Sequence, residues 1–161
     1  MAKKKKRKKS LAVATSVNPQ VHFETTQGSF IADLYSDVPI TTQNFLDLVS
    51  RKFYDGLVFH RYVQGFVIQG GDPTGTGGGG SGKNIPLEIT AHKHVLGALG
   101  MARSQDPNSA SCQFYVCLLD LPSLDGSYAV FGQVVKGMEN AVKLRQGDKM
   151  TRVTLVKAVT P

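Results

Sequence analysis

The first candidate for chemistry is an arginine placed among apolar residues. Residues 57–63 are rich in β-branched and aromatic side chains, which predicts a strand. Since side chains alternate between the two faces of a strand, Phe59, Arg61 and Val63 share one face. A guanidinium keeps its charge in proteins, so Arg61 needs either hydrogen-bond acceptors or a partly open groove. Two interpretations follow: a functional cation lining a groove, or an arginine held by an ion pair at the rim of a sheet.

Glycines crowd residues 70–84, and Gly77, Gly82 and Lys83 nearly match the spacing of a phosphate-binding loop. Such a loop continues with a serine or threonine that holds magnesium and then with a helix. Here Asn84 stands at that position, and the Ile-Pro that follows it is not helical. The segment is therefore interpreted as a surface loop whose glycines adopt positive φ, without nucleotide binding.

Two histidines, His92 and His94, are spaced so that both could face one metal ion from a strand. They make only half of a site, because no nearby cysteine or carboxylate pair completes it, and we expect exposed loop histidines instead. No serine lies in the G-x-S-x-G context of a hydrolase nucleophile. We therefore expect no metal and no cofactor.

The positive charge of the chain is concentrated in one segment. The 161 residues carry a formal net charge of +7, and the run from Lys3 to Lys9 supplies seven positive charges. The rest of the chain is formally neutral, so a basic nucleic-acid-binding surface on the folded part is not expected. We predict a disordered polybasic arm over residues 1–18 and one domain over residues 19–161. The arm could contact RNA, an anionic membrane surface or an import receptor, or serve only as a solubilising tail.

Composition also bears on the compartment. No apolar run approaches the ~20 residues of a membrane span, and residues 11–17 are too weakly apolar for a secretory signal. If Cys112 and Cys117 share a strand, they lie ~17 Å apart at ~3.3 Å per residue, which is too far for a disulfide. Buried free thiols fit a reducing compartment, so we expect a cytoplasmic protein.

The remaining pattern predicts a mainly β fold. We expect about eight strands and two helices, without the one-for-one alternation of a parallel sheet. This order favours a closed eight-stranded antiparallel β-barrel capped by two α-helices. Gly65 is expected to interrupt the apolar run as a bulge or a sharp bend. The strands are expected at residues 21–24, 30–35, 57–63, 66–69, 95–101, 113–118, 129–135 and 152–159, and the helices at residues 39–52 and 137–145.

Several segments together resemble the signature of the cyclophilins, a family of peptidyl-prolyl cis-trans isomerases. The match extends over about residues 20–160, in order and with the right spacings, which makes it far more specific than any single motif. The matching segments are TTQNF (41–45), FHR (59–61), GF (65–66), QGGDPTGTG (69–77), GMARS (100–104), PNS (107–109), SCQFY (111–115) and LDGSYAVFG (124–132).

The resemblance implies an eight-stranded antiparallel barrel with two capping helices. It also implies catalysis of cis-trans rotation about X-Pro bonds in folding or flexible polypeptides. Arg61 matches the family's catalytic arginine, and two further groups match positions that line the proline pocket or hold the substrate backbone. The pocket residues are Phe66, Val67, Tyr115, Leu124 and Tyr128, and the backbone-holding residues are Gln69, Ala102, Arg103 and Gln113.

The chemistry of X-Pro rotation requires neither a nucleophile nor a metal. Twisting the amide breaks its resonance and makes the nitrogen a better hydrogen-bond acceptor. A fixed guanidinium that donates to this nitrogen stabilises the twisted state more than the planar one. The alternative function is a proline-binding scaffold with little turnover. The intact set of Arg61, Phe66, Gln69 and Gln113 favours the enzyme.

Four positions depart from the best-known eukaryotic members of the family. Ser123 stands in place of a tryptophan, so high-affinity cyclosporin binding is not expected. Tyr128 replaces a histidine, Arg103 an asparagine and Tyr115 a phenylalanine, and these changes resemble bacterial-type, single-domain members. They are expected to tune substrate or inhibitor preference more than to abolish catalysis. We expect a monomer whose partners are proline-containing polypeptides, with a weak polyanion contact through Lys3–Lys9.

Overall fold

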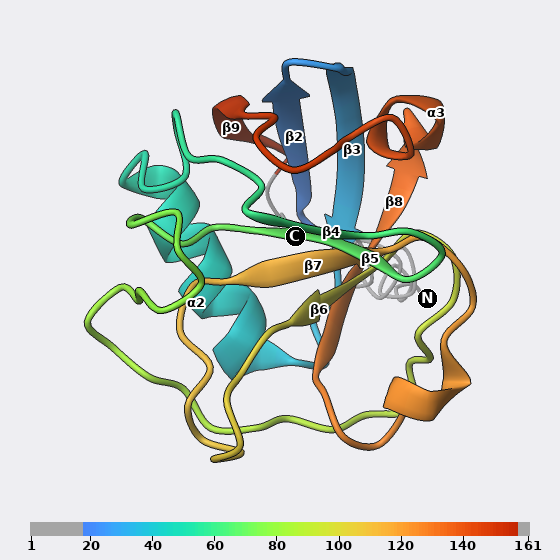
Figure 1. Ribbon diagram of the computed structural model, residues 1–161. Helices are drawn as coiled ribbons and strands as arrows, with labels where there is room; N and C mark the ends of the chain where they lie inside the picture. The colour runs from blue at the N-terminus through green and yellow to red at the C-terminus, as the bar shows by residue number, and fades with distance from the viewer. Residues whose placement is uncertain (1–17, 158–161) are drawn as a thin grey trace, which may run out of the picture.

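Eight strands build one antiparallel sheet in residues 18–157, the part of the chain that the computed structural model describes (Figure 1). Buried and more exposed side chains alternate in β2 and β3, whereas β6 and β7 are buried throughout. Neighbours in the sheet follow the order β4-β5-β7-β6-β8-β3-β2-β9. Most of the predicted polybasic arm falls in residues 1–17, outside the described residues. The strands are β2 (Gln20–Thr25), β3 (Gly28–Leu34), β4 (Arg61–Val63), β5 (Val67–Gly70), β6 (Ala98–Met101), β7 (Phe114–Cys117), β8 (Val130–Lys136) and β9 (Met150–Lys157).

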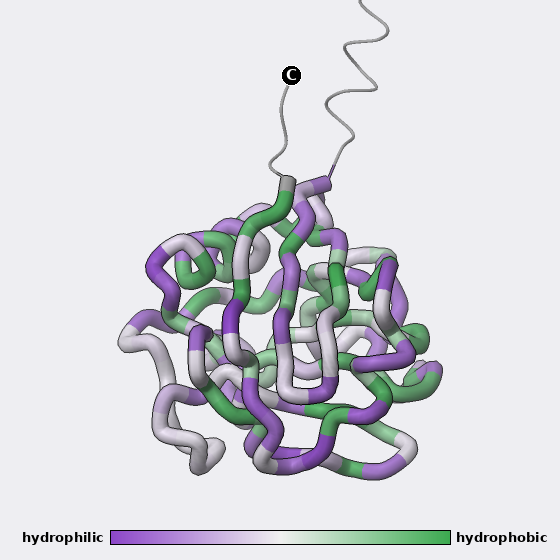
Figure 2. Tube along the Cα trace, turned by 90° about the horizontal axis from the view of Figure 1, so that it is seen from above, coloured by the Kyte–Doolittle hydropathy of each residue, from purple (hydrophilic) through white to green (hydrophobic). Residues whose placement is uncertain are grey.

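The sheet curls on itself but remains open between β4 and β9. Segments that precede these two strands approach each other and exchange backbone hydrogen bonds. The Phe59 N–H donates to the Asp148 carbonyl at 2.7 Å, and the Gly147 N–H donates to the Phe59 carbonyl at 2.9 Å. The predicted mainly β, eight-stranded antiparallel architecture is confirmed, whereas a continuous closed ladder is not seen. Gln20 of β2 pairs with Lys157 of β9, so the two ends of the described chain lie side by side (Figure 2).

The core is aromatic, and the β2–β3 hairpin supplies its first layer. Phe23 and Phe30 face each other in the ladder, and their rings stack with centroids 4.6 Å apart. Phe45, from helix α2 (Pro39–Ser50), packs against Phe114 and Phe131 with centroids 5.3 and 5.1 Å away. All five rings are fully buried, so this cluster contributes apolar burial and ring–ring contacts to the stability of the fold.

Helix α2 begins at Pro39, whose missing N–H would have no intrahelical partner in any case. The carboxylate of Glu88 accepts hydrogen bonds from the Ile40 and Thr41 N–H groups at 3.1 and 2.6 Å. A carboxylate at this end also complements the helix dipole. The helix ends at Ser50, two residues before the predicted end, because Lys52 adopts a left-handed φ of 59°.

Two predicted elements are shorter than the sequence pattern indicates. The second helix, α3, covers only Met138–Ala141, because the chain then tightens into turns that the Arg145 guanidinium ties to the Val142 and Leu144 carbonyls. The strand expected at residues 57–63 reduces to β4, because residues 57–59 bond across the opening of the sheet instead of to β5. Gly65 makes the predicted sharp bend, with a φ of 69°. A short 3-10 helix, η1 (Pro122–Leu124), was not predicted.

Both cysteines are free and buried, as expected. Burial raises the pKa of the Cys112 thiol to about 11 and that of Cys117 to about 12, so both remain protonated. Cys112 precedes β7, and only Cys117 lies on the strand. Within residues 18–157, no helix has the length and apolar character needed to cross a bilayer.

Candidate active site

A pocket of about 500 Å³ opens beside β4, β5 and β7. Nine of the ten site residues predicted from the sequence line it: Arg61, Phe66, Val67, Gln69, Ala102, Arg103, Tyr115, Leu124 and Tyr128. The tenth, Gln113, lies in an adjoining hollow of about 310 Å³ that shares Gln69, Ala102 and Arg103 with the pocket. The structure therefore brings together residues that are far apart in the sequence.

Arg61 is positioned by the register of the sheet. It lies opposite Gln69 on the β4–β5 ladder, and its Nη1 donates to the Gln69 Oε1 at 3.0 Å. The guanidinium carbon lies 5.9 Å from the centroid of the Phe66 ring. Arg61 is exposed, and no carboxylate within residues 18–157 forms an ion pair with it. The interpretation of Arg61 as an ion-paired rim residue is therefore wrong, and the guanidinium faces the pocket as a free cation.

A chain of amide groups continues from Arg61 into the glycine loop. The Gln69 Nε2 donates to the Gln113 Oε1 at 3.1 Å. The Gln113 Nε2 in turn donates to the carbonyls of Gly77 and Gly79 at 2.9 and 3.0 Å. Because each amide both accepts and donates, the orientation of one fixes the next. This chain holds Arg61 and the glycine loop in one arrangement.

The apolar wall of the pocket comes from the ends of β5, β7 and η1. Val67 and Tyr115 are nearly fully buried, and Phe66, Leu124 and Tyr128 are partly buried around them. The rings of Tyr115 and Tyr128 meet edge to face with centroids 6.2 Å apart. Gly100 makes room for Tyr115, since a Cβ there would overlap the phenol ring.

His94 forms a buried polar network behind this wall. Its Nδ1 lies 2.8 Å from the Asp125 Oδ1, and its Nε2 lies 2.8 Å from the Tyr115 hydroxyl. The expectation of two exposed loop histidines is wrong for His94, which is 1% exposed. The Asp125 pKa is lowered by hydrogen bonds from the His94 backbone and side chain. Burial raises the pKa of Tyr115, so its hydroxyl stays protonated and can donate to the imidazole.

His92 and His94 do not converge on a common site. His92 stacks on Tyr35 with centroids 3.7 Å apart, and its Nε2 lies 2.8 Å from the Asp37 Oδ1. Across residues 18–157, no group of three or more histidine, cysteine, aspartate or glutamate side chains is arranged to hold a metal ion.

The glycine loop is organised around Asp72, which is 1% exposed. Its carboxylate accepts hydrogen bonds from the N–H groups of Thr74, Gly77 and Gly79 at 2.8, 2.6 and 3.1 Å, and from the Thr74 hydroxyl at 2.8 Å. Burial alone would raise the pKa of Asp72, but these donors lower it well below its usual range. The glycines thus surround a carboxylate of the chain itself, which is consistent with the prediction that the loop binds no nucleotide phosphate.

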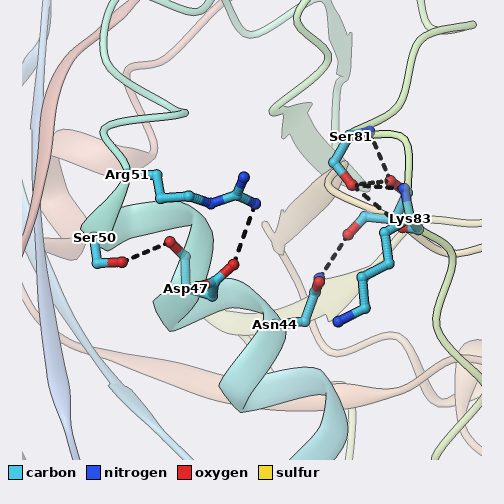
Figure 3. A network of polar contacts seen from close by, with 7 residues as sticks. Asn44, Asp47, Ser50, Arg51, Ser81 and Lys83 are labelled. Carbon is cyan, nitrogen blue, oxygen red and sulfur yellow. Dashed lines mark hydrogen bonds and ion pairs between the residues drawn. The ribbon is translucent and has the colours of Figure 1, made fainter.

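Helix α2 anchors the far side of this loop (Figure 3). The Asn44 Nδ2 donates to the Ser111 carbonyl at 2.7 Å, and the Ser111 Oγ accepts from the Ser81 N–H at 2.8 Å. At the exposed C-terminal end of the same helix, Asp47 forms an i,i+4 ion pair at 3.2 Å with Arg51, the residue that follows the helix. Through Asn44, the buried face connects the helix to the glycine loop.

Three lining residues were not identified from the sequence: His60, Thr76 and Gly77. Alternation along a strand places His60 on the face opposite Arg61, but β4 begins only at Arg61, so strict alternation does not hold at residue 60. Its Nδ1 is buried and has no hydrogen-bond partner among the described residues. Burial lowers the His60 pKa, with Arg61 adding to the decrease and Asp72 opposing it, so the ring lines the pocket in its neutral form near pH 7.

Comparison with known proteins identifies the family. The model of the cyclophilin-type peptidyl-prolyl cis-trans isomerases matches residues 20–160. Peptidyl-prolyl cis-trans isomerase CYP18-2 of Arabidopsis thaliana is 45% identical over 127 residues, which are 75% of this chain and 77% of the relative. A peptidyl-prolyl cis-trans isomerase of Synechococcus elongatus is 40% identical over 140 residues, 85% of this chain and 96% of the relative.

Solved structures give the same result. A cyclophilin-type peptidyl-prolyl cis-trans isomerase of Cryptosporidium parvum superposes with a TM-score of 0.82 at 31% identity, covering 89% of this chain and 99% of that one. A second crystal structure of that protein, in the presence of the dipeptide Ala-Pro, superposes with a TM-score of 0.75 at 32% identity, covering 88% of this chain and 99% of that one. The fold, the pocket and the matched sequence together show that this chain belongs to the cyclophilin-type peptidyl-prolyl cis-trans isomerase family.

Proposed function

We propose that this isomerase accelerates rotation about X-Pro bonds in flexible polypeptides by donating a hydrogen bond from Arg61 to the twisted amide. The uncatalysed barrier of ~18–20 kcal/mol arises from the partial double bond between the carbonyl carbon and the proline nitrogen. Exchange therefore takes tens to hundreds of seconds without a catalyst. The catalyst needs only to stabilise the twisted amide more than the planar ones.

The observation that carries this proposal is the position of the Arg61 guanidinium. It lies at the edge of the apolar wall, is held by Gln69 at 3.0 Å, and has no carboxylate partner within residues 18–157. A preorganised donor of this kind needs no reorganisation when the amide nitrogen becomes an acceptor. Arginine suits the task because its planar fork is directional and permanently charged.

The other lining residues divide into two groups in this mechanism. Phe66, Val67, Tyr115, Leu124 and Tyr128 enclose the pyrrolidine ring and exclude water from it. Gln69, Ala102, Arg103 and Gln113 hold the backbone on either side of the proline. With the ring fixed, rotation moves the carbonyl that precedes it, and each ~1.4 kcal/mol of preference for the twisted state adds about a factor of ten in rate.

An NMR exchange experiment separates the enzyme from the proline-binding scaffold. A short Ala-Pro peptide with resolved cis and trans signals is mixed with substoichiometric protein. We expect exchange cross-peaks between the two isomers that are missing without protein. Shift changes that show binding, without any acceleration of exchange, would support the scaffold and contradict the enzyme.

Three properties of the whole protein are proposed from the sequence. We place it in the cytoplasm as a monomer, and we propose that the Lys3–Lys9 run makes a weak contact with polyanions such as RNA. Binding of this kind should weaken steeply with salt and disappear when residues 2–9 are deleted. Equal RNA binding by the truncated chain would refute the proposed role of the run.

A further inference from the structure

Arg103 lies where three hollows of the surface meet. It lines the pocket of about 500 Å³, the adjoining hollow of about 310 Å³ beside Gln113, and a third hollow of about 580 Å³ next to Tyr128. Arg103 therefore borders the pocket and both adjoining hollows. The remaining residues of the third hollow carry small polar groups: Ser104, Gln105, Ser123 and Ser127.

The guanidinium of Arg103 is held in one position before any ligand arrives. Its Nε and Nη2 donate to the Ser127 carbonyl at 3.1 and 2.8 Å, and its Nη1 donates to the Ser104 and Gln105 carbonyls at 2.9 and 3.3 Å. Its central carbon lies 4.7 Å from the centroid of the Tyr128 ring. A fixed cation loses little conformational entropy when it binds an anion.

Among residues 18–157, no acidic side chain forms an ion pair with this guanidinium. None of the residues lining the three hollows is aspartate or glutamate, and within residues 18–157 no carboxylate forms an ion pair with Arg61 or Arg103. The two acids closest to the hollows in sequence, Asp125 and Asp106, are engaged by backbone N–H groups. The Asp125 Oδ1 accepts from the His94 N–H at 2.7 Å, and the Asp106 Oδ1 accepts from the Asn108 N–H at 2.9 Å.

We propose that Arg103 makes this isomerase selective for proline segments with an anionic side chain, a carboxylate or a phosphate, next to the proline. The inference rests on the proposed function, because that function places the proline ring against the apolar wall of the cavity that Arg103 also lines. Consecutive Cα atoms are ~3.8 Å apart, so a residue next to the proline lies at the pocket that Arg103 also lines and can extend its side chain toward the guanidinium. Charge-assisted hydrogen bonds are stronger than neutral ones, although the partial exposure of Arg103 keeps the effect modest.

Matched peptides test the proposal by binding rather than by turnover. In the first pair, glutamate or glutamine stands immediately before the proline, and in the second pair it stands immediately after the proline. The third pair carries phosphoserine or serine before the proline. Dissociation constants come from NMR titration at low and high salt. We expect the anionic member of at least one pair to bind about three- to fivefold more tightly at low salt, with the difference shrinking at high salt.

Three variants assign the effect to Arg103. Arg103→Gln should abolish the preference, and Arg103→Lys should keep its direction because the charge remains. Arg145→Gln is the matched control, because Arg145 also lies over a tyrosine ring, 4.4 Å from the centroid of Tyr62, yet lines none of the three hollows. The Arg145→Gln variant should keep the full preference for the anionic peptide. Each comparison is the ratio of the dissociation constants of two peptides for one variant. A change that weakens the binding of both peptides equally therefore leaves this ratio unchanged.

Equal affinities for the anionic and neutral members of all three pairs would overturn the proposal, and so would a preference that survives in Arg103→Gln. If Arg103→Gln does not fold, the wild-type ratios and their salt dependence decide. The same samples report cis-trans exchange of the glutamine peptides. Normal exchange with no anionic preference would refute the selectivity and leave the proposed function intact. An anionic preference without exchange would support the selectivity and refute the proposed function.

Discussion

The imidazole Nε2 of His94 lies 2.8 Å from the phenolic oxygen of Tyr115, so a buried hydrogen bond supports the apolar wall of the pocket from behind. Asp125 accepts from the opposite ring nitrogen, which leaves Nε2 as the acceptor for the tyrosine hydroxyl. The network joins the segment before β6, strand β7 and the turn after η1. A residue outside the pocket thereby fixes the position of a ring inside it.

Removing the Tyr115 hydroxyl should destabilise the protein. In Tyr115→Phe the ring still fills its place, but the buried His94 Nε2 loses its donor, and we expect the free energy of unfolding to fall by about 1–2 kcal/mol. Urea denaturation measures the change. Tyr62→Phe is the control, because Tyr62 is only partly buried and lies away from this network. Equal stability of Tyr115→Phe and wild type would contradict the role assigned to the hydrogen bond.

The Asp72 carboxylate should give the protein a specific sensitivity to acid. Its folded pKa lies below its unfolded value of ~3.9. The stability that it contributes is therefore complete above that pH and is lost as the pH falls toward the folded pKa. Asp72→Asn should lower the free energy of unfolding at pH 7 by about 2–3 kcal/mol, because its amide cannot accept as many hydrogen bonds as the carboxylate does.

The pH dependence distinguishes Asp72 from a general effect of lost charge. Between pH 5 and pH 2.5, wild type should lose more stability than Asp72→Asn. Asp106→Asn serves as the control, since Asp106 is an exposed loop carboxylate that accepts one backbone hydrogen bond from Asn108. Parallel pH profiles for wild type and Asp72→Asn would show that the carboxylate does not organise the loop.

Two adjacent glycines of the same loop should respond differently to alanine. A Cβ on Gly79 would overlap the Asp72 Oδ1, whereas the nearest atom to a Cβ on Gly78 is the Thr76 Oγ1 at 3.7 Å. We expect Gly79→Ala to be clearly destabilised and to lose isomerase activity, because the Gly79 carbonyl also holds Gln113 at 3.0 Å. The free energy of unfolding of Gly78→Ala should lie within about 0.5 kcal/mol of the wild-type value. Thermal unfolding of the pair checks this, and equal stability of the two variants would refute the packing argument.

Regular periodicity made much of this fold predictable. The strict alternation in Val21 and Phe23, and again in Phe30, Ala32 and Leu34, allowed the β2–β3 hairpin and its buried face to be read directly. The spacing of Phe45, Leu48 and Val49 likewise gave α2. Cyclophilin motifs then selected the site residues, nine of which line one pocket.

Features that depend on long-range contacts could not be predicted in the same way. His94 resembles any loop histidine until the fold brings it to Tyr115. The motifs assign Gln69 and Gln113 to one site, but they do not predict that the two amides, 44 residues apart in the sequence, bond directly to each other. Local propensity also predicted that α3 extends to Arg145. The helix instead ends at Ala141, and the Arg145 guanidinium donates to the Val142 carbonyl in the turn that follows. The opening of the sheet depends on how far the curled strands come together, which no local pattern specifies.

The most direct test of the central claim is the isomerase rate of Arg61 variants on an Ala-Pro peptide. Arg61→Ala should retain its fold, because Arg61 is exposed, and should lose about 10²–10³-fold in kcat, the usual cost of removing one preorganised donor. The kcat of Arg61→Lys should lie between those of wild type and Arg61→Ala, since lysine keeps the charge but not the directional fork. Arg51→Ala, at the exposed residue that follows α2, should match wild type. An Arg61→Ala variant that is folded and works at the full rate would contradict the proposed mechanism.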